Sequence, residues 1–177
     1  MKNQVLIFLV LLPALLHSQE RKDIILFPEK DGAVVYEGIV DMPNLPKDQI
    51  FNNAVKFVAI NAGDSKNVNR VNDKETGQII LKGNLPARIK KGLVDWSETV
   101  NLTLQIDCKD NRYRYRLFNI SFDLRKGTAE DRNKEALGEK TGPIVKRWIP
   151  VYIAAVDTEI KSYIDKMVKD IAKNDDF

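Results

Sequence analysis

Apolar and polar positions along the chain show two kinds of pattern, one typical of strands and one typical of helices. Runs rich in Val, Ile and aromatic residues predict strands, at 33–42, 68–72, 78–82, 96–108 and 112–125. Steps of three and four between apolar positions predict an amphipathic helix from Pro46 to Gly63 and another from Pro150 to the C-terminus. A polar helix is predicted over 128–137, with Thr128 as its N-cap. Residues 83–92, with two glycines and a proline, predict a loop.

The longest strand pattern predicts a hairpin around Asp110 and Asn111, residue types that tolerate tight turns. Counting outward from this turn gives the cross-strand pairs Lys109–Arg112, Cys108–Tyr113, Asp107–Arg114, Ile106–Tyr115, Gln105–Arg116 and Leu104–Leu117. Because side chains alternate across a strand, the tyrosines fall on an apolar face and the arginines on a polar one. Base stacking needs aromatic rings beside cations on one surface, so the run 111–118 is not predicted to bind nucleic acid. Cys108 is predicted to be a small core residue.

After Leu117 the apolar positions change phase, to Phe118, Ile120 and Phe122. Either a β-bulge resets the strand at this point, or this half of the strand is apolar on its second face. The second alternative would leave an apolar surface that needs a cover or a ligand.

The pattern at the N-terminus predicts an export signal. Lys2 precedes the apolar run 5–16, which is shorter than the ~20 residues of a membrane-spanning helix but fits the core of a secretory signal peptide. We expect cleavage after Ser18 and a periplasmic or extracellular mature protein without a membrane span. A buried N-terminal helix is the alternative, which the abrupt polar run 19–23 disfavours.

Removal of residues 1–18 reduces the set of catalytic and metal-binding side chains that the mature chain can use. It takes away His17, the single histidine, and leaves Cys108 as the single cysteine. The mature chain then has no histidine for a catalytic triad or a zinc site and cannot form an internal disulfide. No cofactor motif is present. The formal net charge of +3 falls by one with Lys2, too balanced to demand a polyanionic partner.

Candidate binding residues lie in two places. Arg88, Lys90 and Lys91 form a small basic cluster in the predicted loop, followed by Trp96. Arg114, Arg116 and Phe118 lie on the second hairpin strand. If the five cations of these two groups bind a polyanion, the affinity should fall steeply with salt.

Besides polyanion binding, an enzymatic function is the other alternative to a binding or structural module. Asp73, Glu75 and Asp107 could serve a carboxylate-dependent hydrolase. The first two lie in a predicted turn between two strands, where Asp and Glu are common turn residues exposed to water.

Three stretches carry a resemblance to a known family: VVYEGIVDMPNLPKDQIFNNAVKF at 34–57, DKETGQIILKG at 73–83 and DNRYRYRLFNISFDLRKG at 110–127. They resemble a bacterial family of secreted domains of unknown function with a TATA-box-binding-protein-like (TBP-like) fold. The resemblance implies an α+β fold in the order β-α-β-β-β-β-α, with a curved antiparallel sheet of about five strands and helices on one face. It implies no activity, and a fold does not carry DNA binding with it.

The resulting expectation is a signal peptide at 1–18, a leader at 19–32, a TBP-like domain at 33–125 and a helical segment at 126–177 that packs on it. We expect an exported, non-catalytic binding or structural module whose partner is an envelope protein or a small ligand on the open sheet face. A homo-oligomer is a further option for the same surface.

Overall fold

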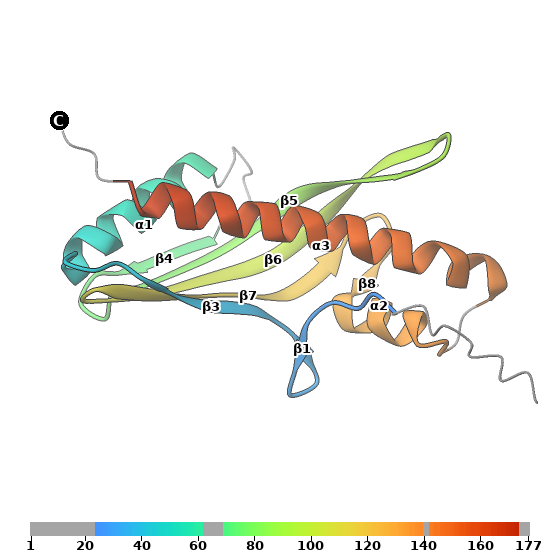
Figure 1. Ribbon diagram of the computed structural model, residues 1–177, viewed down its shortest axis with the longest axis horizontal. Helices are drawn as coiled ribbons and strands as arrows, with labels where there is room; N and C mark the ends of the chain where they lie inside the picture. Colours follow the sequence, from blue (N-terminus) through green and yellow to red (C-terminus); the bar gives the residue numbers. More distant parts are fainter. Residues whose placement is uncertain (1–23, 62–68, 140–141, 174–177) are drawn as a thin grey trace, which may run out of the picture.

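The computed structural model describes residues 24–61, 69–139 and 142–173 (Figure 1). The predicted signal peptide at 1–18 and its cleavage point lie outside the described residues. The elements in chain order are β1 (Glu29–Lys30), β2 (Ala33–Val34), β3 (Tyr36–Asp41), α1 (Lys47–Asn61), β4 (Asn69–Asp73), β5 (Gln78–Lys91), β6 (Val94–Lys109), β7 (Arg112–Phe122), β8 (Gly127–Thr128), α2 (Ala129–Ala136) and α3 (Pro143–Ile171).

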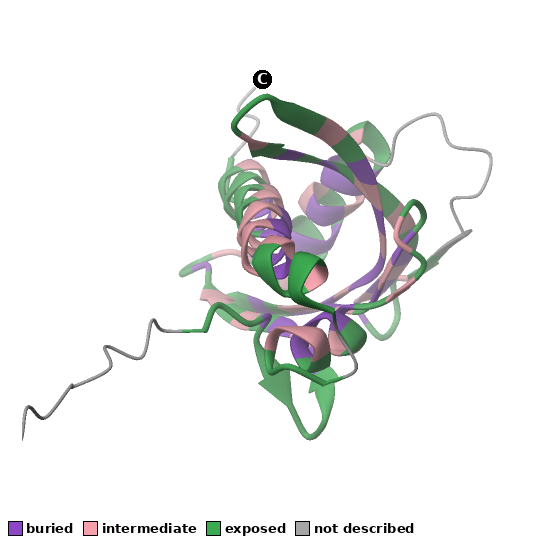
Figure 2. Ribbon diagram, turned by 90° about the vertical axis from the view of Figure 1, so that its right-hand side faces the viewer, coloured by how far each residue is buried: buried purple, intermediate pink, exposed green. Residues whose placement is uncertain are grey.

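One antiparallel sheet carries the fold, with the strand order β3-β7-β6-β5-β4 and the short β8 beside β7. The sheet curls around α3, so that buried residues lie between the sheet and the helix (Figure 2). β1 and β2 form a separate two-stranded hairpin. The predicted fold class, the curvature and the order β-α-β-β-β-β-α are confirmed.

The core lies between the inner face of the sheet and the apolar stripe of α3. Leu104, Ile106 and Leu117 of the sheet and Val156 and Ile160 of α3 belong to one hydrophobic cluster, and all five side chains are fully buried. Cys108 is 1% exposed and belongs to the same core, as its alternation in the strand predicts.

The β6–β7 hairpin has the predicted register at all six pairs. Of the two turn residues, Asn111 alone adopts a positive φ, of 64°. The turn also orders the start of α1, because the Asp110 carboxylate accepts a hydrogen bond of 2.7 Å from the Lys47 N–H. A carboxylate at this position satisfies a free N–H and favours the helix dipole.

The phase change in β7 is a β-bulge. The register shifts between Asn101 and Thr103 of β6, and Asn119 opposite them has a φ of 53°. The bulge turns Ile120 and Phe122 back into the core, where they are 1% and 3% exposed. The alternative of a continuous apolar outer face is therefore wrong.

The predicted loop at 83–92 is wrong, because β5 continues without a break to Lys91. Gly83 and Pro86 suggested a break, yet both pair with β6, opposite Leu102 and Thr99. β4 pairs with β5 only as far as Lys82. Among the described residues, none pairs with β5 on the other side of Pro86, so its missing N–H interrupts no described ladder there.

The start of the last helix is also corrected. α3 begins at Pro143 and carries Pro150 inside it. Pro143 occupies the first turn, where proline removes no helical hydrogen bond. Ile149 and Tyr152 on either side of Pro150 are fully buried, and their packing keeps the helix continuous through the proline.

Candidate docking surface

The outer part of the β5–β6 hairpin forms a two-stranded extension, defined here as residues 83–99. Among the described strands, none pairs with β5 beyond Lys82 or with β6 before Val100, apart from the two strands with each other. The extension projects past the rest of the sheet in Figure 1 and has α3 along its inner face. A two-stranded hairpin is marginally stable alone, so α3 is what holds it.

Alternation along the extension splits the predicted basic cluster between two faces. Ala87 and Ile89 are fully buried against the core, so Arg88 and Lys90 point outward and are exposed. Lys91 lies on the inner side, where its ammonium donates a hydrogen bond of 2.9 Å to the Arg147 carbonyl of α3. The three cations therefore do not form one binding patch.

Each arginine among the predicted binding residues is paired with a carboxylate. Arg88 holds Asp95 through bonds of 2.9 and 2.5 Å, Arg114 holds Asp107 at 2.7 Å, and Arg116 approaches Glu37 at 3.6 Å. The hydrogen bond from Arg88 also keeps the pKa of Asp95 below its usual value. This compensation weakens the polyanion hypothesis, because a paired arginine offers a phosphate little free charge.

Both tryptophans of the chain lie where the extension meets α3. Trp96, opposite Ile89 in the ladder, packs on Trp148 with ring centroids 5.6 Å apart. The Lys91 ammonium lies 4.7 Å from the Trp148 ring centroid, a favourable cation–π geometry. Trp96 and Lys91, both predicted from the sequence, thus fasten the extension to the start of α3.

The end of this arrangement, which we call the tip, comprises residues 92–94 and the start of α3 at 143–148. Leu93 is fully exposed, and Ile144 and Val94 are 76% and 47% exposed. Lys91, Gly92, Pro143, Ile144, Arg147 and Trp148 line a hollow of about 500 Å³ between the hairpin and the helix. Leu93, Val94 and Ile144 were not predicted from the sequence. The signal was present, because Leu93 and Val94 follow Gly92 at a hairpin turn, where polar residues are usual.

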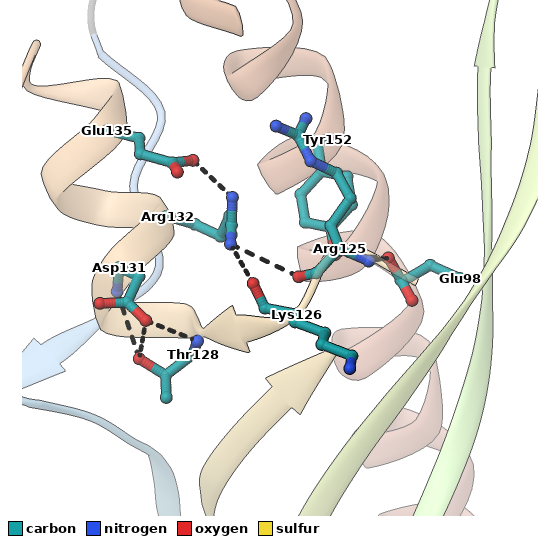
Figure 3. Close-up of polar contacts among 8 residues, drawn as sticks. All are labelled: Glu98, Arg125, Lys126, Thr128, Asp131, Arg132, Glu135 and Tyr152. Carbon is teal, nitrogen blue, oxygen red and sulfur yellow. Dashed lines mark hydrogen bonds and ion pairs between the residues drawn. The ribbon is translucent and has the colours of Figure 1, made fainter. Parts of the chain in front are cut away.

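A buried polar cluster holds the extension to the body behind the tip (Figure 3). The Glu98 carboxylate, in a side chain 1% exposed, accepts hydrogen bonds from the N–H groups of Thr99, Leu124 and Arg125 and from the Tyr152 hydroxyl at 3.1 Å. Burial and the nearby Glu98 charge raise the pKa of Tyr152. Both carboxylate oxygens are occupied by structural donors, so Glu98 orders the 123–126 turn.

Arg132 of α2 completes the cluster. Its guanidinium donates to the carbonyls of Arg125 and Lys126, at 3.4 and 3.0 Å, and pairs with Glu135 at 2.6 Å. Thr128 caps α2 in a reciprocal capping box with Asp131, as the sequence predicts for Thr128. The same turn is thus held from β6 on one side and from α2 on the other.

Two carboxylates of the hydrolase alternative, Asp73 and Asp107, accept hydrogen bonds from neighbouring groups. Asp73 accepts hydrogen bonds from the N–H groups of Glu75 and Thr76, and these turn contacts, led by Thr76, lower its pKa. Partial burial raises the pKa of Asp107, but bonds from Gln105, Gln78 and Arg114 bring it below its usual value. A general acid at neutral pH needs a raised pKa.

The predicted residues Arg114, Arg116 and Phe118 lie along β7, away from the tip. The Arg116 guanidinium rests over the Phe118 ring at 5.4 Å. Their neighbours on this outer face, Gln105 and Asp107, are polar, and the bulge has removed the apolar surface that a ligand would use. The open sheet face therefore loses its main support as a ligand site.

Within 24–61, 69–139 and 142–173, no group of three or more His, Cys, Asp or Glu side chains could hold a metal ion. The helices of the same ranges include none that is both long enough and apolar enough to cross a membrane.

Comparisons with known proteins agree on the fold. Residues 36–123 match the family described as "Domain of unknown function (DUF4468) with TBP-like fold". A TBP-like protein from Parabacteroides distasonis is similar in structure, with a TM-score of 0.69 and 22% identity over 83% of this chain and 97% of that chain. A DUF4468 family protein from Bacteroides ovatus gives a TM-score of 0.63 and 19% identity over 85% and 93%.

No curated protein matches the chain. The two structural neighbours support the fold alone at these identities. The family match covers the sheet from β3 to the end of β7, including the whole extension, and agrees with the resemblance found in the sequence. Residues 36–123 of the chain therefore belong to this family of TBP-like domains of unknown function.

Proposed function

We propose that the protein is an exported, non-catalytic binding module that docks on an envelope partner through the tip. The observation that carries the proposal is the exposure of Leu93, Val94 and Ile144 at one end of the molecule. Single exposed apolar residues are common on protein surfaces, but an apolar group at a projecting turn points to a contact surface. The apolar run at 5–16 supports export.

The architecture behind the tip supports the same proposal. A docking element works best on a rigid support, because ordering it during binding costs free energy. Trp96, Trp148 and the Glu98 cluster supply such a support, since they fix the extension to α3 and to the 123–126 turn. The surface is thus held in place before a partner arrives.

The test compares a tip variant with a matched control in the source organism. The tip variant is Leu93→Ser with Ile144→Ser, and the control is Val71→Ser with Ile60→Ser. Val71 and Ile60 are 57% and 79% exposed, on β4 and α1. Substituting residues this exposed should leave stability within about 0.5 kcal/mol, which thermal unfolding of both variants checks.

The wild-type protein and the control should sediment with the envelope after cell lysis, and the tip variant should be released to the soluble fraction. If the tip variant sediments as the wild type does, the tip is not the docking surface and the proposal fails. An untagged, full-length gene keeps the export route intact in all three strains.

A further inference from the structure

We propose that the partner of the tip is an anionic lipid surface, into which the apolar end of the hairpin inserts while the surrounding cations meet the headgroups. This inference rests on the proposed function, because it names the partner of the same surface. It concerns shallow contact with a bilayer and requires no spanning segment.

The shape of the tip fits shallow insertion. Leu93 lies at the turn of the hairpin, and the extension projects beyond the neighbouring strands (Figure 1). Ile144, in the first turn of α3, lines the hollow beside Gly92, so a second apolar side chain reaches the same end. Apolar residues that enter the interface of a bilayer penetrate about 5–10 Å, a depth that a hairpin end can supply.

The charge around the tip is positive. Lys90, Lys146 and Arg147 are exposed, and none of the three has a carboxylate partner within 4.0 Å among the described residues. Lys91 adds a fourth positive charge beside Trp148. Asp95, the acid on the extension next to them, is already paired with Arg88. Cations near an anionic leaflet strengthen its binding to a protein surface.

Together the two features favour lipid over a protein partner. Leu93, Val94 and Ile144 are exposed at this end, and the neighbouring cations Lys90, Lys146 and Arg147 form no ion pair with a carboxylate of the described residues. A bilayer interface accepts such an end without a shaped pocket, and phosphate headgroups complement the cations at any angle of approach. The alternative partner is a protein with an acidic groove, and binding to vesicles distinguishes a lipid partner from it.

The chain carries its own probe for this contact. Its two tryptophans, Trp96 and Trp148, both lie at the inner end of the tip. Indole rings favour the interface between water and hydrocarbon. If the tip enters a bilayer, the tryptophan emission should shift to shorter wavelength, and no labelling is needed to see it.

The experiment mixes the purified mature chain with vesicles of phosphatidylcholine alone or with added phosphatidylglycerol, and measures cosedimentation and tryptophan emission. We expect binding and a blue shift only with phosphatidylglycerol, and loss of both at high salt. The Leu93→Ser/Ile144→Ser variant should bind about 30-fold more weakly. Lys90→Gln/Arg147→Gln should bind about 25-fold more weakly, since each cation contributes about fivefold.

The Val71→Ser/Ile60→Ser control should bind as the wild type does. Wild-type protein that ignores phosphatidylglycerol vesicles would overturn the lipid proposal, as would tip variants that bind them fully. If the tip variant loses envelope sedimentation in cells while the wild type ignores vesicles, the proposed docking function stands and the partner is a protein. If the tip variant keeps envelope sedimentation, the docking function itself falls.

Discussion

The base and the tip of the β5–β6 hairpin have the same alternation of side chains, but the base is part of the core and the tip is exposed. At its base, β4 and β7 flank the hairpin, and α1 and α3 contact its strands. Ile79, Leu81, Leu104 and Ile106 there are at most 3% exposed. In the extension, α3 is the cover of the inner face as far as Ile89 and Trp96. Beyond these residues the apolar side chains of the tip meet water.

The difference lies in the neighbours and not in the strands themselves. Both ends have paired backbones and alternating side chains, but burial depends on which elements lie alongside. Where β4 and β7 stop pairing, the hairpin changes from core to projecting surface.

The largest expected difference is in thiol reactivity. Cys108 at the base is buried, and burial raises the pKa of its thiol to about 12. A cysteine placed at the tip by Leu93→Cys in a Cys108→Ala background should be freely accessible. We expect the wild-type thiol to react with a disulfide reagent at least about a thousandfold more slowly, because it needs an opening of the core. Similar rates would show that the base is not closed.

Substitutions at the base should lower the free energy of unfolding more than substitutions at the tip. Ile106→Ala removes a fully buried side chain and should lower the free energy of unfolding by about 3 kcal/mol. Val94→Ala, on the same strand β6 but at the tip, should lower it by less than about 0.5 kcal/mol. Urea unfolding measures both, and a large loss for Val94→Ala would mean that the tip belongs to the core.

The junction between the base and the tip depends on Glu98. Glu98→Gln replaces one acceptor oxygen with a donor and leaves buried N–H groups or the Tyr152 hydroxyl without a partner. We expect a loss of about 2 kcal/mol in urea unfolding. Glu139→Gln, at an exposed position, is the control and should change little. An equal loss in both variants would contradict a special role for Glu98.

The smallest effect concerns pH at the far end of α3 from the tip. Hydrogen bonds from Lys166 and Lys173 lower the pKa of Asp170 from 3.8 to about 2. A lowered pKa adds stability above the ordinary value, and this part is lost as the pH falls from 3.8 towards 2. Asp170→Asn should therefore lose slightly less stability than the wild type over this window, as urea midpoints can show. A steeper loss in the variant would reverse the assigned sign.

Much of the fold could be predicted from local patterns in the sequence. The register of β6 and β7 followed from counting away from Asp110 and Asn111, because strand periodicity and a short turn leave few alternatives. The Thr128 cap was predicted for the same local reason. The phase change after Leu117 narrowed the choice to two structures, and the pairing opposite Asn119 decided between them.

Features that depend on distant neighbours were missed. Pro86 and Pro150 suggested breaks, and each is tolerated because of what lies beside it. Pro86 lies at an edge of β5 that no described strand pairs with, and Pro150 has buried flanking residues. Glu98 gave no signal in the sequence, because donors to its carboxylate come from the distant residues 124, 125 and 152. The candidate site was half found, since Trp96 and Lys91 were named but Leu93 and Ile144 were not.

The most direct test of the contrast is hydrogen–deuterium exchange of the mature chain with and without phosphatidylglycerol vesicles. The base of the hairpin should exchange slowly in both states, because its backbone is paired on both sides within the sheet. Vesicles should slow exchange at 88–97 and at 143–148, and leave the rest of the chain unchanged. Slowed exchange along β3 or β7, with no change at the tip, would contradict the account and place the docking surface elsewhere.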